Sequence, residues 1–456
     1  MLLLGIVASL ALAACGGGGA ERPDIAQPSA FTYPPAPAIP PTLGEDATGA
    51  ARKLIAGLVA GNLDQGALDE VVASRDPRMA WIVADALRFI QSGSEEEALV
   101  AAFGTLTGED ASRDPSFAES PWKSITNHLF AWDLPAPPRY RDLKGRLFTR
   151  LEPGWQPFFD DADSDIDWRV VSWGGVLIDD RRPGDKEPCP RGCIPALDDP
   201  PVTDAAGGSW YPDDRLVFGV VVGDEALALP KNIMEVHEMV NITLGGRRLG
   251  IPYCTLCGSA QAYLTDAVPE GVDTPVLRTS GLLSRSNKVM YDLRTRSVFD
   301  TFTGRALSGP LHERKIILRQ TTLVTSTWGE WKAAHPDTRI LARDGGLGRT
   351  YPADPLRGRD DNGPIFPIGP VDPRLPVQAK VLGVIGSQGP VAFPVDQARS
   401  ALADADTVEA AGVSVSADGG GLRARVGGRA VVAHEAFWFA WSQFHPDTVV
   451  WTPLGR

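Results

Sequence analysis

Residues 217–230 read VFGVVVGDEALALP, and residues 381–394 read VLGVIGSQGPVAFP. The two segments align without gaps and share Val, Gly, Val, Ala and Pro at matching places. Both are rich in apolar and β-branched residues, a composition typical of strands, with small or polar residues between the apolar runs. Their recurrence indicates an internal repeat in the second half of the chain.

A second pair of matching segments follows each of these. Residues 327–338 read TWGEWKAAHPDT and residues 437–448 read FWFAWSQFHPDT, so both contain Trp-x-x-Trp-x-x-x-His-Pro-Asp-Thr. Because proline disfavours helical geometry in the preceding residue, we expect His335 and His445 to end a Trp-bearing helix. The repeated order predicts a duplicated β-rich α+β domain over residues 140–456, with copies at about 210–341 and 375–453.

The sequence before this region predicts helices. ARKLIAGLVAGNL (51–63) and RMAWIVADALRFIQSG (78–93) place apolar residues at helical spacing. We therefore expect a small all-α domain over 45–135 that offers a docking surface for a protein partner. Residues 16–44 begin with four glycines and continue into TYPPAPAIPPT, which is typical of a tether.

The N-terminus predicts export. Residues 1–15 read MLLLGIVASLALAAC, an apolar run that ends in small residues, as in a secretory signal. Cys15 follows Leu-Ala-Ala, which resembles a bacterial lipobox and implies lipidation of Cys15 and anchoring in the cell envelope. Gly16 favours the outer membrane. An ordinary signal peptide is the alternative, and no Lys or Arg precedes the apolar run.

Charge and motifs exclude several classes of function. The net charge is −13 without a basic run, which argues against nucleic acid as a partner. The glycine-rich runs lack the Lys-Ser/Thr of a P-loop, so we expect no nucleotide cofactor. Beyond the N-terminus, no apolar stretch is long enough to span a bilayer.

Several segments resemble a known family. DWRVVSWGGVL (167–177), LPKNIMEVHEMVN (229–241), YCTLCGSAQAY (253–263) and FWFAWSQFHPDT are similar to the bacterial and archaeal domain-of-unknown-function family numbered 3179. The resemblance covers roughly Asp167 to Pro453 and implies no established activity. CPRGC (189–193) departs from the family's pattern.

The cysteines mark a difference between the two copies. Pro230 and Trp328 are 98 residues apart, whereas the matching Pro394 and Trp438 are 44 residues apart. The longer first copy contains Cys254 and Cys257, and the second copy contains no cysteine. Packing of the repeated unit therefore does not require this Cys-x-x-Cys segment, which favours a function for it.

A metal site is the first hypothesis for that function. The helix predicted over PKNIMEVHEMVN places His237 on its apolar face, and a hairpin around Gly245-Gly246 then leads to Cys254. If the hairpin folds back, His237, Cys254 and Cys257 converge. Imidazole and thiolates together select zinc or copper(I). In another arrangement, Cys189 and Cys193 complete a four-thiolate zinc site.

Three alternatives stay open. Cys254 and Cys257 are a thiol–disulfide redox pair, or a structural disulfide, or the chain is a non-catalytic interaction protein. Export permits oxidation, and a Cys189–Cys193 disulfide is the simpler interpretation of CPRGC. The sequence assigns no catalytic residue and does not decide whether the protein is an enzyme.

Overall fold

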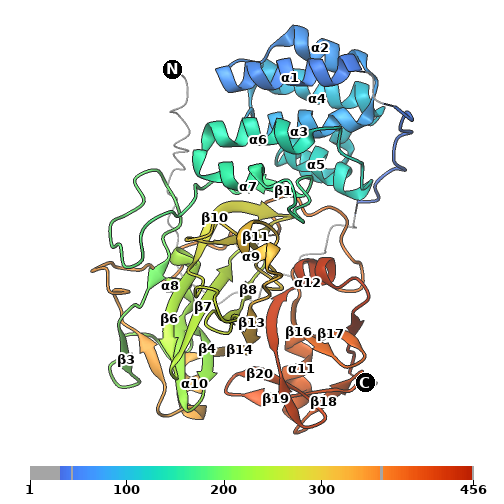
Figure 1. The fold of residues 1–456 in the computed structure, drawn as a ribbon. Coiled ribbons are helices and arrows are strands. Elements are labelled where there is room, and N and C mark those ends of the chain that lie inside the picture. Colours follow the sequence, from blue (N-terminus) through green and yellow to red (C-terminus); the bar gives the residue numbers. More distant parts are fainter. Residues whose placement is uncertain (1–30, 43–44, 360–362, 454–456) are drawn as a thin grey trace, which may run out of the picture.

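A computed structural model describes residues 31–42, 45–359 and 363–453 (Figure 1). Helices form the N-terminal part and strands dominate the remainder, so the predicted order of a helical region before a β-rich region is confirmed. The predicted signal peptide and Cys15 lie outside the described residues. In the parts that are described, no helix is long and apolar enough to cross a membrane.

Seven helices make up the N-terminal part of the described chain. They are α1 (Glu45–Ala60), α2 (Gln65–Ala73), α3 (Ala80–Leu87), α4 (Gly93–Thr107), α5 (Pro121–Ala131), α6 (Tyr140–Leu151) and α7 (Gln156–Asp160). Asp76 caps the 3-10 turn that leads into α3, because its carboxylate accepts a hydrogen bond from Arg78 N at 2.9 Å. The helical run therefore continues to Asp160, beyond the predicted end at 135.

The segment 31–42, which the sequence assigns to the tether, lies against these helices. The rings of Phe31 and Tyr33 pack on His128, with centroids 5.6 and 5.1 Å away. The Trp132 indole donates a hydrogen bond to Pro34 O at 2.8 Å. Aromatic packing thus fixes this part of the predicted tether on the helical region.

Strands in the described chain form five sheets. The first contains β1 (Val171–Trp173), β10 (Leu277–Ser284), β11 (Asn287–Asp292) and β12 (Val298–Asp300), in spatial order. The second contains β13 (Arg319–Thr321), β9 (Ala262–Leu264), β7 (Arg247–Cys254), β6 (Met239–Leu244) and β2 (Leu197–Asp198), with β8 (Ser259–Ala260) paired on β7.

The third sheet contains β14 (Leu323–Thr327), β4 (Leu216–Val222), β5 (Glu225–Pro230), β15 (Arg339–Leu341) and β3 (Val202–Asp204). The fourth contains β22 (Ala433–Phe437), β16 (Lys380–Gly386), β17 (Gly389–Pro394) and β23 (Val449–Val450). The fifth contains β18 (Val408–Ala410), β19 (Val413–Asp418), β20 (Gly421–Val426) and β21 (Arg429–Val431).

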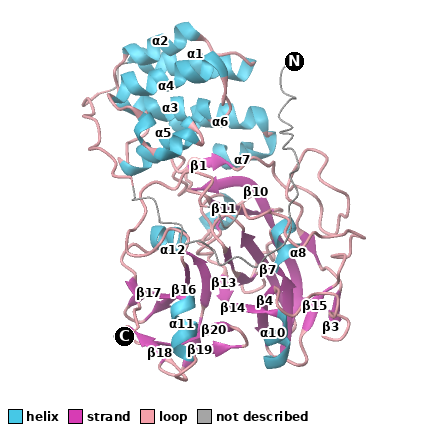
Figure 2. Cartoon of the chain, turned by 180° about the vertical axis from the view of Figure 1, so that it is seen from behind, coloured by secondary structure: helices cyan, strands magenta, loops and turns pink. Residues whose placement is uncertain are grey.

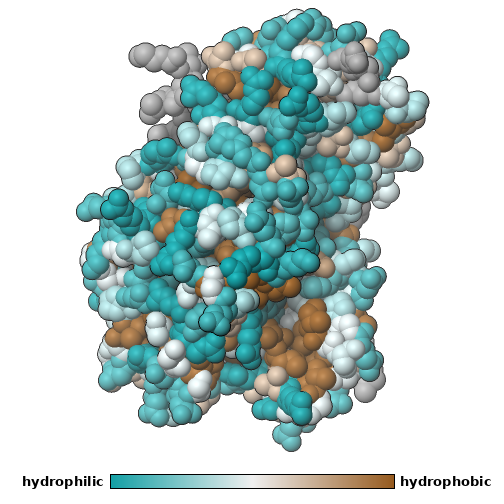
Figure 3. Space-filling model, in the orientation of Figure 1, coloured by the Kyte–Doolittle hydropathy of each residue, from teal (hydrophilic) through white to brown (hydrophobic). Residues whose placement is uncertain are grey.

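Helices α8 (Lys231–His237), α9 (Gly309–Glu313), α10 (Trp328–Ala334), α11 (Val395–Leu402) and α12 (Trp438–Phe444) complete the β-rich part. Figure 2 shows α11 and α12 beside β16 and β17. On the face in Figure 3, hydrophilic residues cover most of the helical part, and hydrophobic residues gather lower, over the region of β16.

The third and fourth sheets have matching pairings. β4 pairs antiparallel with β5 and β14, and β5 pairs parallel with β15. In the fourth sheet, β16 pairs antiparallel with β17 and β22, and β17 pairs parallel with β23. Even the register agrees, because Val217 faces Pro230 and Val381 faces Pro394.

The shared residues of the repeated segments meet in both sheets. A Cβ atom at Gly219 would overlap the Trp331 ring, and one at Gly383 would overlap the Trp441 ring. Each indole donates a hydrogen bond to the threonine of the His-Pro-Asp-Thr segment, Trp331 to Thr338 at 2.9 Å and Trp441 to Thr448 at 3.0 Å. In both sheets, therefore, the tryptophan ring can occupy its position only because the strand residue beneath it is glycine.

His335 and His445 end α10 and α12, as the following prolines predicted. Each has non-helical backbone angles, and each ring packs on the tryptophan one turn earlier, with centroids 4.0 and 4.2 Å apart. Their role at these positions is to terminate the helix.

The helical part does not have a core of its own. Its buried side chains form one continuous cluster with residues of the first sheet, among them Leu282, Val289 and Tyr291. The Trp155 indole also donates a hydrogen bond to Ser280 O at 2.7 Å. Figure 1 shows β10 beneath α7 and β1 beside it, so the first sheet packs against the helical part.

Candidate functional site around Cys254 and Cys257

Cys254 and Cys257 flank a tight turn between two strands. β6 and β7 form the hairpin expected around Gly245-Gly246, and β7 ends at Cys254. The chain turns over residues 255–258 and returns as β8, where Ser259 pairs with Cys254. The two cysteines form a disulfide, with Cα atoms 5.4 Å apart.

The turn is held against the fourth sheet on one side. Cys257 O accepts a hydrogen bond from Phe437 N at 2.9 Å, and the Lys380 ammonium donates to Gly258 O at 2.7 Å. Gly258 has a φ of 57°, and a Cβ there would lie 2.8 Å from the Phe437 ring. Only glycine fits this approach, and Cys254 and Cys257, 3% and 1% exposed, both belong to the apolar cluster around α12.

Cys254 faces a cavity on the other side. The cavity has a volume of about 510 Å³, and Cys254 lines it while Cys257 does not. Two backbone N–H groups point at Cys254 Sγ, that of Cys257 at 3.3 Å and that of Lys288 at 3.4 Å. The two sulfurs of the disulfide therefore have different surroundings.

An ion pair between a buried lysine and a half-buried glutamate lines the same cavity. The Lys288 ammonium donates to a Glu238 carboxylate oxygen and to Glu238 O, both at 2.9 Å, and Thr255 donates to the other carboxylate oxygen at 2.9 Å. Burial lowers the pKa of Lys288, while the charge of Glu238 opposes that shift. Thr255 belongs to the Cys-x-x-Cys turn, so the network connects the turn to β11.

Sequence reasoning did not identify Lys288 or Glu238 as site residues. Glu238 adjoins His237 in the quoted helix segment, but it lies past the end of the helix with a φ of 51°. That left-handed residue redirects the chain into β6, and α8 is shorter than the predicted helix for this reason. No local sequence pattern indicates that the side chain of Lys288, on β11, forms an ion pair with Glu238.

The structure does not bring His237 together with the two cysteines. His237 Nδ1 lies 2.7 Å from Pro195 O, and Nε2 lies 2.7 Å from the Tyr351 hydroxyl. Among the described residues, no cluster of three metal-ligating atoms includes His237, Cys254 or Cys257. Burial lowers the pKa of His237 to about 4, so the ring is neutral and its two nitrogens hold neighbouring segments.

A family model described as "Protein of unknown function (DUF3179)" matches residues 191–426. The match covers more than half of the chain. The chain belongs to the DUF3179 family. No curated protein and no solved structure matches it. Cys254, Cys257, Glu238 and Lys288 all lie within the matched region of this DUF3179 protein.

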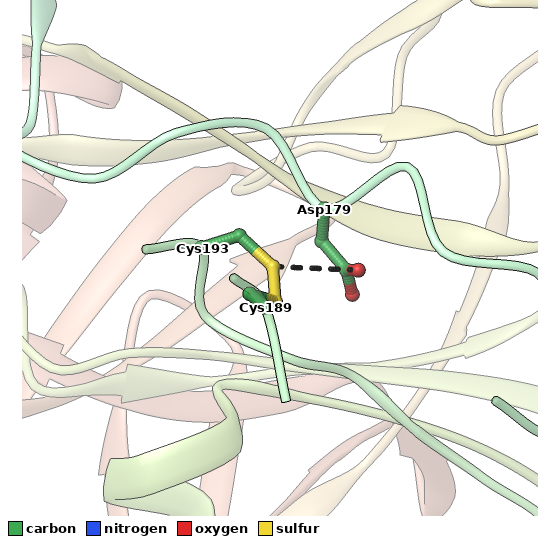
Figure 4. A group of neighbouring side chains, drawn as sticks. All are labelled: Asp179, Cys189 and Cys193. Atoms are coloured by element: carbon green, nitrogen blue, oxygen red, sulfur yellow. Dashed lines mark hydrogen bonds between the residues drawn. A yellow bond between two sulfur atoms is a disulfide. The ribbon is translucent and has the colours of Figure 1, made fainter. Parts of the chain in front are cut away.

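The other cysteine pair of the DUF3179 protein lies where the family match begins. Cys189 and Cys193 form a disulfide, and Cys193 Sγ lies 3.6 Å from Asp179 Oδ1 (Figure 4). Asp179 is fully buried, accepts hydrogen bonds from Arg181 Nε at 2.7 Å and Ala196 N at 2.8 Å, and lies 3.6 Å from Arg278 Nε. Two arginines thus already compensate the charge of the Asp179 carboxylate. The arrangement is typical of a structural contact between chain segments.

Proposed function

We propose that this protein is an exported, lipid-anchored thiol–disulfide exchange protein whose reactive pair is Cys254 and Cys257. One observation carries the proposal: Cys254 lines a cavity and its Sγ accepts two N–H groups, whereas Cys257, buried in the same apolar cluster, does not line that cavity. Such asymmetry is what separates an attacking thiol from a resolving thiol.

The surroundings of Cys254 favour its thiolate. In the reduced protein, the N–H donors at Cys254 Sγ stabilise a thiolate relative to the neutral thiol. Cys257 does not line the cavity, and among the described residues no N–H group donates to its Sγ, so its thiolate is less stabilised.

The exchange proceeds in two steps. The Cys254 thiolate attacks one sulfur of a substrate disulfide, which forms a mixed disulfide and releases the other substrate sulfur as a thiolate. Cys257 then loses its proton and attacks Cys254 Sγ, which restores the internal disulfide and releases the second substrate thiolate. Two electrons pass from the protein dithiol to the substrate disulfide, and the two protons end on the substrate thiols.

Trapping of the mixed disulfide tests this proposal. Trypsin releases residues 249–278 as one peptide that carries both cysteines and no others. We expect the reduced Cys257→Ser protein to form a stable adduct on this peptide with a peptide disulfide probe. Cys254→Ser should react roughly ten-fold more slowly, because the remaining Cys257 neither lines the cavity nor has the two N–H donors. The adduct is measured by mass spectrometry.

The matched control is the double variant Cys189→Ser, Cys193→Ser, which should react at the wild-type rate. Equal adduct formation on Cys254 and Cys257 would contradict the assignment of roles. A pair that stays oxidised in folded protein at every ambient potential would instead identify a structural disulfide.

Copper or zinc binding by His237, Cys254 and Cys257 stays a prediction of the sequence. With the imidazole engaged by Pro195 and Tyr351, a metal on the reduced protein would rely on the two sulfurs. Metal analysis of anaerobically purified protein tests it. Bound metal that is lost in Cys254→Ser and in His237→Ala supports the three-ligand set, and metal that survives both substitutions contradicts it.

We also infer that the β-rich part arose by duplication of one unit of hairpin, helix, strand, helix and strand. The matching pairings of the third and fourth sheets support this, as does the position of α8 after β5 and α11 after β17. We place Cys15 as the lipidation site in the cell envelope, with the helical part as a docking surface for a protein partner. Two disulfides are consistent with an oxidising compartment.

A further inference from the structure

A second cavity lies on the other side of the segment that carries Tyr351. It has a volume of about 540 Å³ and is lined by Trp210, Tyr211, Arg215, Asn232 and the loop over residues 343–353. It is separate from the cysteine cavity, although Arg349 borders both. The proposed redox function does not use it.

Positive charge is concentrated around this cavity. Arg215, Arg343 and Arg349 all line it and are all exposed. Among the described residues, none of these three guanidinium groups forms an ion pair with a carboxylate. Arg215 donates a hydrogen bond to Ala353 O at 3.4 Å, and Arg349 lies over the Tyr351 ring. In a chain with a net charge of −13, three arginines without a carboxylate partner around one cavity form a local concentration of positive charge.

Asp344 is the acidic residue among those that line the cavity, and its carboxylate accepts hydrogen bonds from its own loop. It accepts hydrogen bonds from Gly346 N at 2.9 Å and Gly348 N at 3.2 Å, which lower its pKa. It therefore stays ionised and shapes the loop. Because the lining contains three arginines and this one carboxylate, its net charge is two positive charges.

Two buried polar atoms in the lining lack partners. Asn232 is 8% exposed, and its Nδ2 donates to Pro352 O at 3.0 Å, which fixes the amide and leaves Oδ1 without a hydrogen bond. The Trp210 indole N–H also has no partner. A buried acceptor and a buried donor without partners are costly unless a ligand satisfies them.

We propose that this cavity binds a hydroxylated organic anion with two or more acidic groups. The arginines bind the carboxylate or phosphate groups by charge-assisted, bidentate hydrogen bonds. The indole N–H adds a donor to an anionic oxygen. Asn232 Oδ1 accepts a hydrogen bond from the ligand hydroxyl, which an anion without hydroxyl groups cannot supply.

Titration calorimetry with citrate and tricarballylate tests the proposal on the full chain. The two tricarboxylates differ by one hydroxyl group. At constant ionic strength, we expect citrate to bind more tightly, because only citrate supplies the donor for Asn232. Arg343→Gln with Arg349→Gln should weaken citrate binding by about ten-fold or more, the range for lost charge-assisted hydrogen bonds.

The matched control is Arg52→Gln with Arg146→Gln, which makes the same change in net charge at exposed positions of α1 and α6. This variant should bind citrate as the wild type does. Equal loss in both double variants, or no citrate binding by the wild type, would overturn the proposal. Equal affinity for the two anions would overturn the role of Asn232. A Trp210→Phe variant should lose the citrate-dependent change in tryptophan fluorescence.

Discussion

At the scale of single residues, the Cys-x-x-Cys turn depends on groups that are remote in the sequence. Glu238 and Lys288 are 50 residues apart, yet their ion pair is buried beside Cys254 and takes a hydrogen bond from Thr255. A buried pair of this kind contributes little when intact, but removal of one partner leaves an uncompensated charge. Lys288 and Glu238 are therefore the residues that tie the turn to the first sheet.

The substitution Glu238→Gln should destabilise the protein strongly. It leaves the Lys288 ammonium buried without a counter-charge, and breaking such pairs costs about 3–5 kcal/mol. Urea unfolding followed by circular dichroism measures the change. The comparison is Asp142→Asn, which breaks the exposed pair with Arg139 and should change stability by less than about 1 kcal/mol. Similar effects of the two substitutions would contradict this account.

At the scale of elements, the repeated hairpins depend on a glycine beneath an indole. Gly219 on β4 and Gly383 on β16 each leave room for a tryptophan from the helix that follows β14 or β22. The ring then reaches the threonine ahead of the last strand of its sheet. In each sheet, the contact between this glycine and this tryptophan thus fixes how close the helix lies to the sheet.

The substitutions Gly219→Ala and Gly383→Ala should each lower the unfolding free energy by about 1–3 kcal/mol, because the added methyl group overlaps a fully buried ring. Gly49→Ala in α1 is the control, because its Cβ would meet no atom within 4 Å. Removal of a helical glycine should stabilise the protein by up to about 1 kcal/mol. Destabilisation by all three substitutions would count against this explanation.

Elements encoded by neighbouring residues could be predicted from the sequence. The hairpin around 245–246, and the ends of α10 and α12 at His335 and His445, follow from local turn and proline rules. The partners of His237 could not be predicted, because Pro195 and Tyr351 lie 42 and 114 residues away. Spacing permitted convergence of His237 with Cys254, but the left-handed Glu238 directs the chain elsewhere.

At the scale of the whole molecule, one hydrophobic core joins the seven N-terminal helices to the first sheet, and the Cys-x-x-Cys turn joins the second sheet to the fourth. The parts expected from the sequence to be separate units are therefore in extensive contact. Buried histidines in such a structure make its stability dependent on pH.

His434 should make the protein less stable in acid. Burial beside Phe302 and Trp441 lowers its pKa from 6.5 to about 3. Between these values the unfolded chain binds a proton that the folded chain does not, so the contribution of His434 is complete above pH 6.5 and is lost as the pH falls toward 3. His434→Phe should flatten the pH dependence of the unfolding free energy over this range. Parallel curves for the two proteins would contradict this prediction.

The hydrogen bond between Phe437 N and Cys257 O also bears on the order of events during synthesis. Phe437 follows Cys257 by 180 residues, so a chain that emerges from its N-terminus presents the cysteine turn long before β22 exists to cover it. If the chain is exported, as we propose, the two thiols meet the oxidising compartment while the turn is still open. The last strands to arrive would then enclose a bond that has already formed.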